Sequence, residues 1–126
     1  MAAKILVVDD DESLRDLLRL HLSGAGYEVS TAADGIGAGY QVLKNPPDLI
    51  LLDVDMPHMD GFEFIAALKS DKTLPEIPVI FLSAVEEGDE RGKELGAVAY
   101  LQKPVMRDRL LAVVAKHVPG GPTPIG

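Results

Sequence analysis

The chain contains no cysteine and no tryptophan among its 126 residues, and aromatic residues make up only 5% of it. Without cysteine, it has neither a disulfide framework nor a zinc site with thiolate ligands. Basic residues are also few: 12 lysines and arginines stand against 20 aspartates and glutamates, for a formal net charge of −8. The basic residues are scattered and form no patch, which argues against direct binding to nucleic acid.

Long hydrophobic runs are missing as well. The longest uninterrupted apolar run covers residues 110–115, far below the roughly 20 residues that cross a bilayer. The first four residues do not open a signal peptide. We therefore expect no membrane insertion and no export.

The composition that remains is that of one small globular domain. Hydrophobic residues make up 47% and charged residues 25%, and a chain of this length buries roughly two thirds of its unfolded surface in a single core. Residues 119–126 are rich in proline and glycine. We expect one domain over residues 1–118, followed by a flexible tail or linker stub over 119–126.

Short apolar runs alternate with helical patterns along the chain, which is typical of βα units around a parallel sheet. The five runs are Ile5–Val8, Tyr27–Ala32, Leu49–Leu52, Val79–Leu82 and Ala99–Leu101. The first, third and fourth are continuously apolar, as expected for central strands that helices cover on both faces. The second run alternates more, so we expect it at an edge of the sheet.

Five helices are expected between and after these strands. Apolar residues recur at helical spacing in four of them. These residues are Leu14, Leu17, Leu18, Leu22 and Ala25 in the first helix; Ile36, Tyr40 and Leu43 on one face of the second, over Gly35–Lys44; Phe62, Ile65 and Leu68, directed inward, in the third, which begins at Gly61; and Leu110, Leu111, Val114 and Val118 in the last. The remaining helix, near Glu86–Leu95, contains two glycines and is expected to be the least stable.

Polar side chains gather where the strands end. Asp9, Asp10 and Asp11 follow the first strand, Asp53 the third, Ser83 the fourth and Lys103 the fifth. Ligands of open parallel sheets bind at this carboxyl edge. A single aspartate there is more often a helix cap, as either Asp11 or Ser13 could be for the first helix, but acids from neighbouring strands facing a lysine indicate a functional site.

Carboxylates from neighbouring strands repel each other unless a cation lies between them. Oxygen ligands without histidine or cysteine favour Mg²⁺, which commonly also binds phosphate oxygens. Lys103 and Ser83 could then contact a phosphoryl group, and a carboxylate could accept that group as an acyl phosphate.

These residues resemble those of the receiver domain of bacterial two-component response regulators, and the resemblance covers the chain to about Val118. Each motif is short, but their order and spacing together are highly specific. The matching segments are Ile5–Asp10, Leu49–Asp53, Met56–Pro57, Asp60–Gly61, Phe81–Ala84, Gly96–Ala97 and Tyr100–Pro104.

The resemblance implies a fold and a function. The fold would be a flavodoxin-like, doubly wound α/β fold with a five-stranded parallel sheet in the order 2-1-3-4-5 and five helices. The function would be that of a cytoplasmic signalling domain, not an enzyme beyond its own phosphorylation and slow dephosphorylation. Its partners would be a sensor histidine kinase or phosphotransfer protein and an unknown downstream protein, with no direct contact to nucleic acid or membrane.

The resemblance also implies residue roles at the acidic edge. Asp53 resembles the phosphoacceptor and a ligand of Mg²⁺. Asp10 and the backbone carbonyl of Asp55 resemble direct Mg²⁺ ligands, and Asp9 resembles a ligand that acts through water.

Further roles fall on the fourth and fifth strand ends. Ser83, with Ala84 after it, resembles the switch hydroxyl that binds the phosphoryl group, and Lys103 resembles the lysine that pairs with it. Tyr100 resembles the aromatic residue that turns inward when Ser83 moves.

Three neighbouring positions resemble residues that modulate the site. Asp55 and Val85 lie two residues beyond Asp53 and Ser83, where similar domains tune the lifetime of the phosphoryl group. A cis peptide bond before Pro104 would direct Lys103 toward the site.

Two alternative functions remain open. The sequence Asp53-Val-Asp55 also resembles the nucleophile motif of Mg²⁺-dependent phosphatases of the haloacid dehalogenase type. There, however, the motif opens the chain, whereas here Asp9 and Asp10 precede it. A degenerate receiver that serves only as a protein-binding scaffold is the second alternative, although every matched site position is filled.

Overall fold

The computed structural model describes residues 2–54, 61–74, 76–84 and 97–118. Its centre is a five-stranded, fully parallel sheet in the order β2-β1-β3-β4-β5, which confirms the predicted topology. The second strand lies at an edge, as its alternating pattern indicated. The strands are β1 (Lys4–Val8), β2 (Glu28–Ala32), β3 (Leu49–Asp53), β4 (Val79–Ser83) and β5 (Ala99–Gln102).

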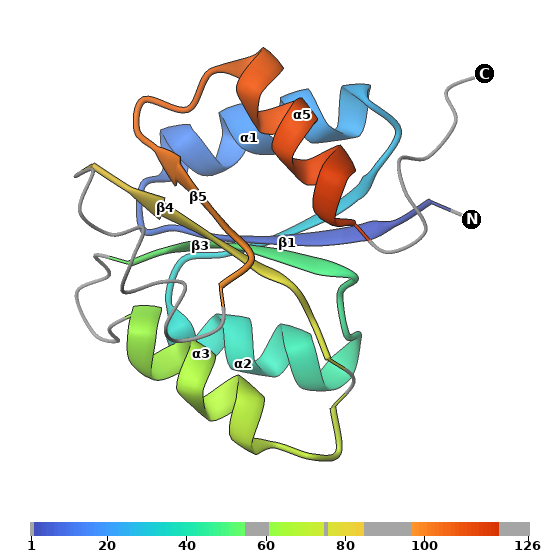
Figure 1. The fold of residues 1–126 in the computed structure, drawn as a ribbon, viewed down its shortest axis with the longest axis vertical. Helices are drawn as coiled ribbons and strands as arrows, with labels where there is room; N and C mark the ends of the chain where they lie inside the picture. The colour runs from blue at the N-terminus through green and yellow to red at the C-terminus, as the bar shows by residue number, and fades with distance from the viewer. Residues whose placement is uncertain (1, 55–60, 75, 85–96, 119–126) are drawn as a thin grey trace.

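Helices cover both faces of the sheet (Figure 1). The described helices are α1 (Glu12–Gly24), α2 (Gly35–Lys44), α3 (Gly61–Ser70) and α5 (Arg107–His117). Figure 1 shows α1 and α5 on one face and α2 and α3 on the other. None of them is long and apolar enough to span a membrane.

The three central strands are buried on both faces, which explains their continuous apolar sequence. In β1, Ile5 and Val7 belong to the core under α1 and α5, whereas Leu6 and Val8 belong to the core under α2 and α3. This alternation follows from the two-residue period of a strand. The two cores pack against opposite faces of the same strands, whose carboxyl ends lie at one edge of the sheet.

Aspartate side chains begin two of the helices. The Asp11 carboxylate accepts hydrogen bonds from the backbone N–H groups of Ser13 and Leu14 at the start of α1, so the cap is Asp11 and not Ser13. The Asp34 carboxylate accepts one from Gly37 at the start of α2. After α1 the chain turns through Gly26, whose φ of 98° favours glycine.

The face of α2 that carries its large apolar residues is exposed and does not pack on the sheet. Ile36, Tyr40 and Leu43 share one face as predicted, but they are 68%, 72% and 65% exposed. The side of α2 that packs on the sheet is made of Gly35, Ala38 and Val42. Small residues let the helix approach the sheet closely and leave the large ones in solvent.

The other helices follow the predicted periodicity more closely. Leu18 and Leu22 of α1 and Leu110 and Val114 of α5 are buried, although Leu17 is 43% exposed. In α3, Leu68 packs against the core and the buried anchor is Phe64. The expected helix at 86–95, the tail at 119–126 and the side chains of Phe62 and Ile65 lie outside what the structure describes.

Candidate functional site

The carboxyl ends of four adjacent strands bring together the residues that the sequence singled out. Asp53 and Ser83 are the last residues of β3 and β4, and Asp9 and Lys103 directly follow β1 and β5. Asp9, Asp53 and Ser83 are almost completely buried. Three polar side chains therefore lie inside the protein at a single edge of the sheet.

Three carboxylates form the centre of this edge. One oxygen each from Asp9, Asp10 and Asp53 lies within 4.8 Å of the others. Asp10 is exposed, while the other two are buried. Negative charges at this separation repel each other strongly where solvent is excluded.

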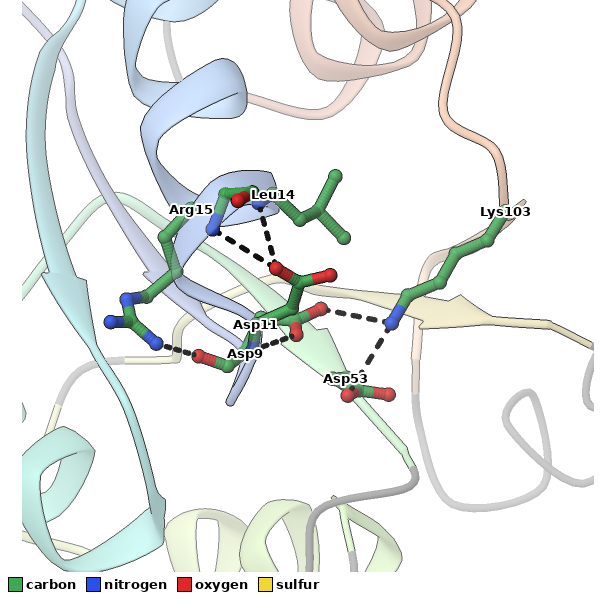
Figure 2. A network of polar contacts seen from close by, with 7 residues as sticks. Asp9, Asp11, Leu14, Arg15, Asp53 and Lys103 are labelled. Atoms are coloured by element: carbon green, nitrogen blue, oxygen red, sulfur yellow. Dashed lines mark hydrogen bonds and ion pairs between the residues drawn. The ribbon is translucent and has the colours of Figure 1, made fainter.

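Lys103 is the counter-charge that the structure supplies. Its Nζ atom lies 3.0 Å from Asp9 Oδ2 and 3.4 Å from Asp53 Oδ2, bridging the ends of β1 and β3 (Figure 2). Burial by itself lowers the pKa of Lys103, but pairing with Asp9 and then with Asp53 outweighs burial and raises it above the usual value. Lys103 is therefore charged at neutral pH, although one ammonium group does not balance three carboxylates.

The carboxylate set fits a hard divalent cation. Asp9 Oδ2 is fully buried, and its partner among the described residues is the Lys103 ammonium at 3.0 Å, which also faces Asp53. An oxygen in this position gains from a further cation. Mg²⁺ binds to one or two carboxylates and keeps several water ligands, which suits two buried acids beside an exposed one.

The backbone holds Asp9 and Lys103 in place. The Asp9 N–H donates to the carbonyl of Ala32 (3.2 Å), and Asp9 Oδ1 accepts from the N–H of Asp11 (2.9 Å). The Lys103 N–H donates to the carbonyl of Ser83 (2.7 Å), and the Lys103–Pro104 peptide bond is cis. The ends of β1 and β5 are thus fixed to their neighbours.

The remaining residues of the predicted site are placed differently. Ala84 follows Ser83 and is exposed. Tyr100 is half-buried and packs against the core under α2 and α3, and its hydroxyl is buried without a hydrogen-bond partner in the described part. Asp55 and Val85 lie outside the described residues, so their expected roles are not placed here.

Arg15 lies beside the site but belongs to none of the sequence motifs that predicted it. This residue of α1 reaches back to the acidic loop, where its Nη1 atom donates to the backbone carbonyl of Asp9 (2.7 Å). No sequence motif predicts this contact. It depends on the conformation of a long side chain that extends from α1 back to the preceding loop. The sequence gives one hint of this contact, which is that Arg15 lies near the start of a helix that follows an acidic loop.

Comparison with known proteins gives a consistent result. The family model of the response regulator receiver domain matches residues 5–115. Response regulator PleD of Caulobacter vibrioides is 47% identical over 107 residues, which are 83% of this chain and 24% of PleD. Response regulator MprA of Mycobacterium sp. (strain KMS) is 43% identical over 114 residues, which are 89% of this chain and 49% of MprA.

Solved structures agree with the sequence relatives. The chemotaxis protein CheY4 of Vibrio cholerae matches with a TM-score of 0.86 and 38% identity, over 93% of this chain and 99% of the CheY4 chain. A response regulator structure from Chloroflexus aurantiacus matches with a TM-score of 0.88 and 33% identity, over 94% of this chain and 98% of the Chloroflexus chain. The chain thus spans whole single-domain structures, but a half or less of the two curated relatives.

Proposed function

The chain belongs to the response regulator receiver domain family, and from this premise we propose that it is a phosphorylatable signalling module of the cytoplasm. It accepts a phosphoryl group on Asp53 from a histidine kinase or a phosphotransfer protein. The observation that carries the proposal is the position of Asp53, which is 2% exposed, 3.4 Å from Lys103 and within 4.8 Å of two further carboxylates. A catalytic environment for phosphoryl transfer needs this combination of an oxygen nucleophile with nearby charge compensation.

In the transfer step, a carboxylate oxygen of Asp53 forms a bond to phosphorus. The bond between phosphorus and the imidazole nitrogen of a phosphohistidine breaks, and its electron pair returns to that nitrogen. The Lys103 ammonium compensates the charge of the phosphoryl oxygens, moving part of its interaction from Asp9 and Asp53 to the new group.

Asp10, Asp53 and the Asp55 carbonyl would hold Mg²⁺, with Asp9 acting through water. When bound, the ion supplies positive charge to the carboxylates and the phosphoryl oxygens. This assignment is supported by the three described carboxylates, whose oxygens lie within 4.8 Å of one another while Lys103 is the lysine that contacts two of them.

Phosphorylation would be read out at the ends of β4 and β5. The Ser83 hydroxyl would donate to a phosphoryl oxygen and draw Ala84 inward, and Tyr100 would then turn further into the protein. Asp55 and Val85 would tune the phosphoryl lifetime. The new arrangement would present a protein-binding surface to a downstream partner.

Acetyl phosphate with Mg²⁺ tests the phosphoacceptor directly. We expect intact-mass spectrometry to show one added phosphoryl group on the wild type and none on Asp53→Asn. Ser70→Ala is a control on an exposed hydroxyl outside the site and should be phosphorylated like the wild type.

Other outcomes of this experiment would contradict the proposal. Equal phosphorylation of Asp53→Asn would place the acceptor elsewhere. A folded wild type that takes up no phosphoryl group would favour the degenerate scaffold. Sustained hydrolysis of phosphomonoesters at about 1 per second or faster would favour the phosphatase.

A further inference from the structure

Arg15 holds the acidic loop from the side opposite Lys103 (Figure 2). Its side chain is half-buried, and in the described part of the chain the carbonyl oxygen of Asp9 is its only hydrogen-bond acceptor. Arg15 forms no ion pair there with any described carboxylate. Arg19, one helical turn later, instead reaches the exposed Asp16 in solvent (3.4 Å).

The carbonyl that Arg15 binds belongs to the peptide unit between Asp9 and Asp10. A peptide unit is planar, so fixing the direction of its carbonyl also fixes the plane that contains the Asp10 nitrogen and Cα atoms. The Asp10 carboxylate itself makes no hydrogen bond or ion pair within the described residues. The position of the Asp10 Cβ atom, from which the carboxylate reaches into the site, is therefore set by the backbone on either side of it.

The two sides of Asp10 are restrained by different groups. After it, the N–H of Asp11 is bound to Asp9 Oδ1 and the Asp11 carboxylate caps α1. Before it, the Asp9 N–H is bound to Ala32, and Arg15 binds the Asp9 carbonyl. Without Arg15, the described hydrogen bonds that oppose rotation of the Asp9–Asp10 peptide plane would be those of the Asp9 and Asp11 N–H groups.

We propose that Arg15 is a positioning residue for the cation site, which orients the Asp10 carboxylate through the Asp9–Asp10 peptide and thereby sets the affinity for Mg²⁺. The inference rests on the proposed function, because it takes the three carboxylates as the Mg²⁺ site. Residues that orient metal ligands without touching the metal typically change metal affinity by about 10–100-fold.

Isothermal titration calorimetry with Mg²⁺ alone measures this role without any phosphoryl chemistry. Arg15→Met retains a long apolar side chain and removes the donor, and we expect it to weaken Mg²⁺ binding about tenfold. Arg15→Lys retains the charge with a different donor geometry, and its Mg²⁺ affinity should lie between those of the wild type and Arg15→Met. Arg19→Met removes an exposed arginine of the same helix and should bind Mg²⁺ like the wild type.

The outcomes separate the inference from the proposed function. If Arg15→Met and Arg15→Lys bind Mg²⁺ as tightly as the wild type, Arg15 has no positioning role, and the cation site stands. If the wild type binds no Mg²⁺, or Asp10→Ala binds it unchanged, the cation site itself is wrong. If Arg15→Met does not fold, the Mg²⁺ affinity of Arg15→Lys tests the positioning role instead, and an affinity equal to that of the wild type overturns the inference.

Discussion

At the scale of single residues, the strongest constraint is the pairing of buried charge. Asp9 is 0% and Asp53 2% exposed, and Lys103 is the cation that contacts both. Taking ionised carboxylates out of water is costly, and removing the partner of a buried ion pair typically costs about 3–5 kcal/mol. The three groups therefore depend on one another for stability as well as for chemistry.

Lys103→Met is expected to lower the free energy of unfolding by about 3 kcal/mol in the absence of divalent cations. Mg²⁺ should return part of this loss, because it supplies positive charge to the same carboxylates. Urea unfolding with and without Mg²⁺ measures both effects, and Lys72→Met is the exposed-lysine control. A loss no larger than that of Lys72→Met would show that Lys103 does not stabilise the buried acids.

Tyr27 gives a pH dependence that is independent of the acidic edge. Burial raises the pKa of its hydroxyl above 10.0, the value for an exposed tyrosine. The unfolded chain then loses this proton at a lower pH than the folded chain, so stability is unaffected below about pH 10 and falls as the pH rises further. Tyr27→Phe should make this alkaline decline shallower, as measured by thermal unfolding between about pH 8 and 11. An identical decline in both proteins would exclude Tyr27 as its source.

At the scale of elements, α2 shows which information a helical pattern contains. The spacing of Ile36, Tyr40 and Leu43 predicted a helix with these residues on one face, and that is correct. Periodicity does not predict which face of a helix is buried. In α2 the buried face is the one with small residues, including Gly35 and Ala38, and the large apolar residues remain exposed. In the central strands no such choice exists, because both faces are apolar and both are covered.

Gly39 of α2 is expected to be replaceable with a gain in stability. A Cβ atom there would meet no atom within 4 Å, and alanine is favoured over glycine inside a helix by about 1 kcal/mol. Gly39→Ala should therefore raise the free energy of unfolding by up to about 1 kcal/mol in urea titrations. Gly37→Ala is the comparison, because its Cβ would lie 3.3 Å from the Asp34 oxygen that caps the helix, and it should gain less. An equal or larger gain at Gly37 would contradict this account.

At the scale of the whole molecule, the resemblance to receiver domains predicted the strand order, and the βα pattern predicted which polar residues gather at one edge of the sheet. Parallel strands end at the same edge, so residues that follow the apolar runs converge, and Asp9, Asp53, Ser83 and Lys103 do so. Features that depend on side-chain conformation could not be predicted this way. The contact of Arg15 with the Asp9 carbonyl and the buried Tyr100 hydroxyl, which has no hydrogen-bond partner among the described residues, both arise from rotamers and packing.

The hydroxyl of Tyr100 suggests how a charge at Asp53 could change a distant surface. Within the described part of the chain this hydroxyl has no hydrogen-bond partner, and a buried hydroxyl left without one costs about 1–3 kcal/mol, so a movement of the side chain that gives it a partner would be favoured. Ser83 and Tyr100 lie on neighbouring strands, with Phe81 paired to Tyr100 and Ser83 to Gln102. A shift of the β4 end toward a phosphoryl group would therefore take place beside Tyr100, and a difference of a few kcal/mol suffices to change the populations of its side chain and, through it, the state of β5.

We expect the phosphoryl mimic beryllofluoride, added with Mg²⁺, to alter amide hydrogen exchange at Ala84 and from Ala97 to Gln102, as well as next to Asp53. Asp53→Asn with the same additions is the control and should show no change, because the mimic needs the acceptor carboxylate. Tyr100→Ala should retain the change at Ala84 and lose it across β5, since the side chain is the link between the two strand ends. If exchange changes only beside Asp53 in the wild type, phosphorylation does not act through Ser83 and Tyr100, and the partner-binding surface must lie on another face.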